Sequence, residues 1–144
     1  MFAKGDSCYS RHYFPSGQLR LYCIEAGEDF TSLVYSEAYY SNGQLLAKLD
    51  YGPKDLELST SYWPNGNKQS KYLWSPWGGG TIVGDYHVWH ENGQLHIKGQ
   101  FTQCTFAQLN DRSCESKEQG TWTYWFEDGR VEKIINYKDG VEVK

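Results

Sequence analysis

Apolar and polar residues alternate in several stretches of this chain, and each stretch begins just after a glycine. A period of two is typical of a β-strand with one buried face. No sustained helical period is present, and the best helical candidate is the short stretch 107–112. The pattern therefore predicts an all-β protein. The alternate positions are Leu45, Ala47, Leu49 and Tyr51 after Gly43; Leu95, Ile97, Gly99 and Phe101 after Gly93; and Val131, Lys133, Ile135 and Tyr137 after Gly129.

The same short phrase precedes these stretches and recurs five times along the chain. It consists of two aromatic or near-aromatic residues, a turn former, then Ser, Asn or Asp, then Gly, at residues 13–17, 39–43, 62–66, 89–93 and 125–129. A recurring interval of this size indicates an array of supersecondary units. We therefore expect one domain over residues 1–144, built from about five tandem β-hairpins. The hairpin tips are expected at Gly17, Gly43, Gly66, Gly93 and Gly129, which lie 26, 23, 27 and 36 residues apart.

Two prolines decide the expected type of turn. Pro15 and Pro64 stand just before the Ser or Asn of their copies. A two-residue hairpin would need an N–H at that position, and proline has none. A three-residue loop fits better, because a type I turn accepts proline at its first central position and a following glycine closes the loop. We expect φ to be positive at Gly43, Gly66, Gly93 and Gly129.

This loop fixes a register for every hairpin. Four of the five expected cross-strand pairs join an aromatic to an aliphatic residue, which is a stabilising combination. We therefore assign the first aromatic of each phrase to the core. The expected pairs are Tyr13 with Leu19, Tyr39 with Leu45, Tyr62 with Lys68, Trp89 with Leu95, and Trp125 with Val131.

The second residue of each phrase falls on the opposite face, across from a polar residue. Aromatic side chains give a large contact area at low entropy cost, so this row is a candidate partner-binding surface. The alternative is that it packs against its neighbours or a second copy. Trp77, beside a run of glycines, could anchor a partner or cap a sheet end. The candidate binding residues are Phe14, Tyr40, Trp63, Trp77, His90 and Phe126.

A longer motif appears in the last two copies: Gly-x-aromatic-x-x-aromatic-x-x-Asn/Asp-Gly-x-Leu/Val. It runs from Gly84 to Leu95 and from Gly120 to Val131, and the other copies match only its core. The motif resembles MORN-type repeats, specifically the variant in bacterial antitoxins of the YwqK type. The resemblance implies an elongated, twisted antiparallel sheet. It also implies an immunity protein that neutralises a cognate toxin, whereas other MORN arrays act as scaffolds or membrane-proximal modules.

Composition narrows the partner classes. The net charge is −4 without a Lys/Arg cluster, which argues against nucleic acid and is compatible with a basic protein such as a nuclease toxin. Mean hydropathy is −0.71, and no apolar run approaches the ~20 residues of a membrane span. Residues 1–11 lack the apolar core of a secretory signal, so we expect a cytoplasmic protein.

The cysteines and histidines give no sign of a metal site. Cys8, Cys23, Cys104 and Cys114 lack CxxC spacing, and we expect free thiols in a reducing compartment. If the protein is exported, Cys104 and Cys114 could be joined across the insertion at residues 103–119. In the expected register His90 and His96 point to opposite faces, away from a shared metal.

No catalytic motif stands out, so we expect no enzyme and no cofactor. The leading function is an antitoxin that binds a toxin domain. The alternative is a scaffold or adaptor, possibly phage-encoded, that holds a host protein. A homo-oligomer is possible in either case.

Overall fold

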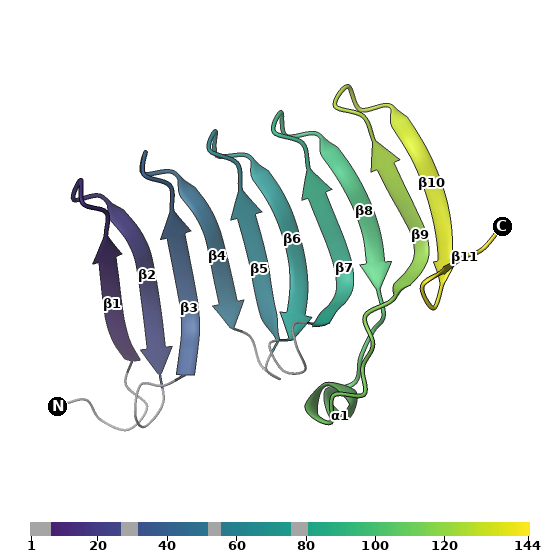
Figure 1. Cartoon of the computed structure of the whole chain (residues 1–144), viewed down its shortest axis with the longest axis horizontal. Coiled ribbons are helices and arrows are strands. Elements are labelled where there is room, and N and C mark those ends of the chain that lie inside the picture. The colour runs from purple at the N-terminus through teal and green to yellow at the C-terminus, as the bar shows by residue number, and fades with distance from the viewer. Residues whose placement is uncertain (1–6, 27–31, 52–55, 76–80) are drawn as a thin grey trace.

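The structure, a computed structural model, describes residues 7–26, 32–51, 56–75 and 81–144. Within these residues one open antiparallel sheet has eleven strands in chain order, one more than five hairpins supply (Figure 1). The expected all-β array of tandem hairpins is confirmed. The elements are β1 Ser7–Tyr13, β2 Leu19–Ala26, β3 Ser32–Tyr39, β4 Leu45–Tyr51, β5 Glu57–Tyr62, β6 Lys68–Ser75, β7 Thr81–Trp89, β8 Leu95–Phe101, α1 Phe106–Asn110, β9 Glu118–Trp125, β10 Val131–Lys138 and β11 Val141–Glu142.

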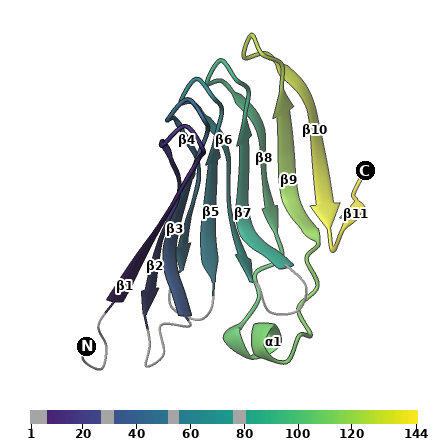
Figure 2. The ribbon, with the colours of Figure 1, turned by 60° about the vertical axis from the view of Figure 1, so that its left-hand side comes forward.

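The hairpins stand side by side in a single row. Their tips lie in a row at one end of the strands, and α1 lies beyond the other end of the strands (Figure 1). The strands turn steadily between β1 and β10, which gives the sheet its twist (Figure 2). β11 extends the sheet beyond β10 with a short two-residue strand.

Each tip has the three-residue loop expected from the prolines. At the second tip the Tyr40 N–H donates to the Gln44 carbonyl over 2.8 Å, and the Gly43 N–H donates to the Tyr40 carbonyl over 2.9 Å. Gly43 has a φ of 88°, and the glycines at the other four tips are also left-handed. The prediction of positive φ is confirmed. Asn42 fits the loop because its Oδ1 accepts the Gln44 N–H over 3.0 Å, as Asx turns do.

The expected first pair of each hairpin is confirmed, but the strands slip directly after it. In the second hairpin Tyr39 pairs with Leu45, and Ala38 then pairs with Ala47. One extra residue in β4 forms a β-bulge, and the same shift occurs in all five hairpins. Because Ala38 and Tyr39 point to opposite sides, so do Ala47 and Leu45. The unbroken alternation expected from Leu45 to Tyr51 is therefore wrong at its first step.

The bulges separate the sheet into two unlike faces. The first aromatic of each turn lies on the side that also carries Arg11, Glu37, Lys71 and Lys98, which we call the mixed face. The apolar strand centres lie on the other side, which we call the aromatic face. Five cross-strand pairs mark the aromatic face: Ser10–Cys23, Ser36–Leu49, Ser59–Tyr72, Tyr86–Gly99 and Trp122–Ile135.

The first four of these pairs place a small residue beside a larger one, and the small residue changes strand along the array. The first three hairpins place Ser on the odd-numbered strand, whereas the fourth places Gly99 on β8. Trp122 fills the space above Gly99, where an added Cβ would lie 2.2 Å from the indole. Trp122 is only 4% exposed and packs edge-on against Phe101, with ring centroids 5.0 Å apart. Trp122 is therefore the centre of a ring cluster over β7–β10.

Candidate binding surface

Side chains at the hairpin tips tie successive hairpins together. The second aromatic of one hairpin donates to the main-chain carbonyl of the first aromatic of the next. The three bonds run from Tyr40 Oη to Tyr62 O (2.9 Å), from Trp63 Nε1 to Trp89 O (3.1 Å), and from His90 Nε2 to Trp125 O (2.8 Å). The bond from His90 requires a proton on Nε2, because a carbonyl only accepts.

Asparagines add a second row of bonds at the same tips. Asn65 Nδ2 and Asn67 Nδ2 each donate to the Glu91 carbonyl over 2.8 Å. Asn92 Nδ2 donates to the Glu127 carbonyl over the same distance. Together the aromatic and asparagine bonds form what we call the tip ladder. An aspartate could close its own turn equally well but could not donate onward.

The tip ladder gives three of the candidate binding residues an internal role. Tyr40, Trp63 and His90 lie on the aromatic face and fasten one hairpin to the next. Phe126 belongs to the last hairpin and is 45% exposed, with the Arg130 guanidinium 5.5 Å from its ring centre. Phe14 also lies at a tip, whereas Trp77 lies outside the described residues. Partner binding by these side chains stays a prediction.

The histidine geometry differs from expectation. His90 and His96 stack with ring centroids 4.1 Å apart, so the expectation that they point to opposite faces is wrong. His96 is the extra residue of the β8 bulge, which turns it toward the aromatic face. Burial, and then the neighbouring His90, lower the pKa of His96. Among the described residues, no cluster of three or more His, Cys, Asp or Glu side chains is arranged to hold a metal.

The mixed face combines rings with charges. The hydroxyls of Tyr35 and Tyr39 both donate hydrogen bonds to the Glu37 carboxylate. The bond from Tyr39 is the main cause that raises the pKa of Tyr39 to about 12. Arg11 lies 5.2 Å from the centre of the Tyr22 ring. Half-buried rings held by charged neighbours can contribute to contact with a protein surface.

Two adjacent hollows on the mixed face form a candidate site, which we call the β6–β9 patch. The first has a volume of about 400 Å³ and the second about 380 Å³. Asp85 lines both. Burial, and then the charge of Lys98, lower the pKa of His87 in the second hollow. The patch comprises Leu58, Lys71, Leu73, Asp85, His87, Lys98, Gln100, Gln103, Thr121, Thr123 and Trp125.

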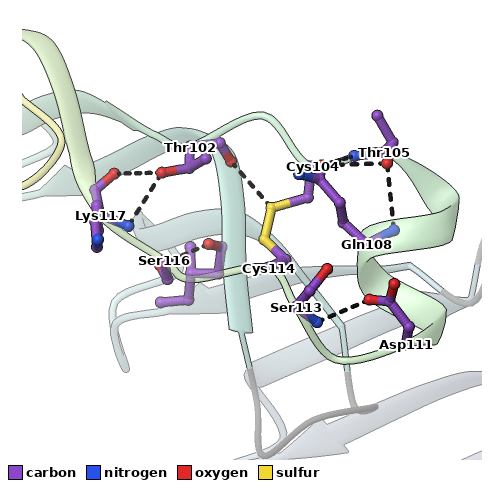
Figure 3. The surroundings of a disulfide bond; sticks show 10 residues. Thr102, Cys104, Thr105, Gln108, Asp111, Ser113, Cys114, Ser116 and Lys117 are labelled. Atoms are coloured by element: carbon purple, nitrogen blue, oxygen red, sulfur yellow. Dashed lines mark hydrogen bonds between the residues drawn. A yellow bond between two sulfur atoms is a disulfide. The ribbon is translucent and has the colours of Figure 1, made fainter.

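The insertion at residues 103–119 is folded and cross-linked. Cys104 and Cys114 form a disulfide with Cα atoms 5.9 Å apart, so the expectation of free thiols is wrong for this pair (Figure 3). Between them α1 spans Phe106–Asn110, close to the predicted 107–112. Its N-terminus is capped by Thr105, whose hydroxyl accepts the Gln108 N–H over 3.2 Å. Cys23 is a free, buried thiol.

The insertion is also attached to the sheet. The Thr102 N–H donates to the Lys117 carbonyl over 2.9 Å, and the Ser116 hydroxyl donates to the Ile82 carbonyl over 2.7 Å. Leu109 of α1 is only 5% exposed. The segment is therefore a structured projection beside β7, near one end of the β6–β9 patch.

One buried acid lies on the aromatic face. Glu57 is 4% exposed, and its Oε2 has no hydrogen-bond partner among the residues that the structure describes. It is paired across the strands with Tyr51 and Trp74. Burial raises the pKa of Glu57, because the charged form loses its water there.

A repeat family matches part of this array. The MORN repeat variant matches residues 35–51 and 118–139, which fall in the second and fifth hairpins. These matches support a MORN-type repeat protein, and such repeats suggest a protein-binding scaffold. No curated protein matches the chain significantly. A crystallised protein of unknown function from Bacteroides fragilis is 14% identical, with 94% of this chain and 95% of that chain covered and a TM-score of 0.23.

The β6–β9 patch escaped the sequence analysis. Its residues come from five strands, β5 to β9, and from Gln103 just after β8, and a bulge at Gly84, where φ is 68°, sets which of them share a face. The position of Gly84 and Gly120 ahead of the last two tips was the available signal, since a glycine inside a strand often marks a bulge. Within the described residues, no helix is long and apolar enough to cross a membrane.

Proposed function

We propose that this protein is an antitoxin or immunity protein of the YwqK type. It binds a cognate toxin domain through the β6–β9 patch and blocks the toxin's active site or its access to substrate. The patch is the observation that carries the proposal. It offers a Trp125 ring, the apolar Leu58 and Leu73, and both signs of charge on neighbouring strands. Aromatic and apolar side chains with polar groups at their rim are typical of protein interfaces.

Rigidity supports the same proposal. The residues of the patch stand on paired strands, and the tip ladder fastens the third hairpin to the fourth and the fourth to the fifth. A preorganised surface loses little entropy on binding, which favours tight inhibition. The net charge of −4 suits a basic toxin such as a nuclease. The proposal includes no enzymatic activity and no cofactor.

The second candidate is a non-enzymatic scaffold that holds a host protein. The matches to the MORN repeat variant favour it, since they suggest protein binding without naming the partner. A cytoplasmic site of action remains part of the proposal. The structure joins Cys104 to Cys114, whereas a reducing cytoplasm would keep the two thiols reduced, so alkylation of these cysteines in intact cells tests the localisation.

Capture followed by a toxicity assay tests the proposal. The tagged chain is used to capture proteins from its native cells, and each captured protein is expressed with and without it. We expect one captured protein to arrest growth alone and to be harmless together with this chain. A captured protein that is never toxic would support the scaffold instead.

Paired variants then test the surface. Trp125→Ala and Lys98→Ala should each weaken binding of the captured protein by about 2 kcal/mol, as truncation of central interface residues does. Lys133→Ala is the matched control, because Lys133 lies on the aromatic face over Tyr124. If only Trp63→Ala or Phe126→Ala weakens binding while the fold is kept, the partner binds the row of second aromatics.

A further inference from the structure

The first strand leaves one end of the sheet unpaired. β1 is the terminal strand, and no described residue pairs with its outer side. The Phe14 N–H points inward to the Gln18 carbonyl. Since the direction alternates along a strand, Tyr13, Arg11 and Tyr9 point their main-chain N–H and carbonyl groups outward. An unpaired row of this kind is a template for another strand.

The opposite end of the sheet is partly closed. β11 pairs with β10 through Tyr137 and Glu142, and the Val143 N–H donates to the Asn136 carbonyl over 2.7 Å. The last tip carries Phe126 and Asp128, neither of which can donate to a further hairpin as Trp63 and Asn65 do. The two ends are therefore unlike, and only β1 offers a fully open edge among the strands that the structure describes.

We propose that two copies of this chain pair β1 against β1 around a two-fold axis at Ser10, forming one continuous sheet. This register places Tyr9 of each copy opposite Arg11 of the other. Both residues point their backbone groups outward and their side chains to the mixed face, as antiparallel pairing requires. The proposal is independent of the toxin partner.

Contacts within the chain show that this pairing is chemically sound. Arg11 already lies 5.2 Å from the centre of the Tyr22 ring on β2, and Tyr9 stacks on Tyr22 with centroids 6.2 Å apart. In the dimer the guanidinium lies between Tyr22 and Tyr9 of the second copy. Tyr9 is 57% exposed, so its ring is free for this contact.

Other registers and partners fit less well. A two-fold axis at Arg11 would oppose two like charges across the strands, which is destabilising. At Ser10 the axis opposes two hydroxyls, and the sheet already contains such a pair in Ser61 and Ser70, with oxygens 2.6 Å apart. Pairing about a two-fold axis is also self-limiting, because it uses up both open edges.

Sedimentation of the full chain, without any partner, tests the proposal. Across a concentration series we expect a species with twice the 16.7 kDa mass of one chain. Tyr9→Pro removes an N–H that points away from β2 and none that bonds to β2. The concentration at which half of the chains are dimeric should therefore rise at least about tenfold. Tyr9→Phe is the matched control and should leave the midpoint unchanged. Circular dichroism checks that each variant keeps its sheet.

A charge exchange tests the register. Arg11→Glu should weaken the dimer. Adding Tyr9→Lys to the same chain should restore it, because the introduced ammonium of each copy then faces the introduced carboxylate of the other. A monomer at every concentration overturns the proposal. So do a dimer that Tyr9→Pro leaves unchanged, a failure of the second substitution to restore pairing, and species that grow beyond two copies, which would indicate β1 pairing with β10.

Discussion

The contact between Gly99 and Trp122 provides the most direct test of how the sheet packs. Gly99 has an ordinary strand conformation, so the backbone accepts an alanine there. The new Cβ, however, would lie 2.2 Å from the Trp122 ring. The indole must therefore move, although it is 4% exposed and packs against Tyr86, Phe101 and Tyr137.

Three contributions set the expected size of the effect for Gly99→Ala. Overpacking costs about 1–3 kcal/mol. Displacing the indole also weakens the 3.2 Å bond from Trp122 Nε1 to the Gln100 carbonyl, worth about 1 kcal/mol. Alanine recovers roughly 0.5–1 kcal/mol because it loses less backbone entropy than glycine. We therefore expect a loss of about 2 kcal/mol, or about 5 °C in Tm.

Urea unfolding of a double-mutant cycle separates this contact from other effects. Trp122→Leu alone should destabilise the protein, but Gly99→Ala should cost much less in its presence. The coupling free energy should be about 1–2 kcal/mol, as for residues in direct contact. If Gly99→Ala is harmless, or if its cost is the same in the Trp122→Leu background, the packing described for the aromatic face is incorrect.

Three further perturbations address other features. Trp63→Phe removes the donor to the Trp89 carbonyl and should cost about 1 kcal/mol in urea unfolding, whereas Phe126→Leu, with no such bond, should cost less. Glu57→Gln should raise stability at neutral pH, because burial raises the pKa of Glu57 in the folded state. The carboxyl therefore contributes its full stability below its ordinary pKa of 4.5, and this contribution is lost as the pH rises through the folded-state pKa. The gain from Glu57→Gln should therefore shrink on acidification, and an equal gain at all pH values would contradict this reasoning. Cys104→Ser removes a cross-link between residues 10 apart, worth about 3 kcal/mol locally, so tryptic cleavage after Arg112 should accelerate while the Tm of the sheet changes little.

The turns could be predicted from the sequence because their determinants are local. Pro15 and Pro64 ruled out a two-residue loop, and the loop fixed the first pair of every hairpin. The left-handed Gly43 and the Asn42 side chain that closes its turn are encoded within five residues. Local chemistry of this kind is readable without knowledge of tertiary contacts.

The sequence did not predict which side chains share a face of the sheet, because this depends on bulges that the turn residues do not encode. One extra residue after Leu45 moves every later side chain of β4 to the opposite face. The equivalent bulge in β8 was not foreseen either, so the stacking of His90 on His96 was not predicted. Several residues on the aromatic face are themselves small or polar, such as Ser36 opposite Leu49. A sequence pattern of hydrophobicity alone therefore did not identify the apolar side.

The candidate site was missed for a related reason. Lys98 on β8 and Thr123 on β9 are direct cross-strand neighbours only in the folded sheet. Asp85 lines the same hollow from β7, which pairs with the other side of β8. The Cys104–Cys114 bond likewise depends on α1 folding the insertion back on itself. Partner binding by the second residues of the turns stays a prediction, and the bonds by which Tyr40, Trp63 and His90 join neighbouring hairpins also depend on the folded array.

Hydrogen exchange of the chain with and without its captured partner shows which strands the partner covers. If the partner binds the β6–β9 patch, amide exchange should slow over residues 81–89, 95–101 and 118–125, which form β7, β8 and β9. Exchange in β3 and β4, far along the sheet, should be unchanged. Protection confined to β1–β4 or to residues 105–114 of the insertion, with none in β7–β9, would contradict the account.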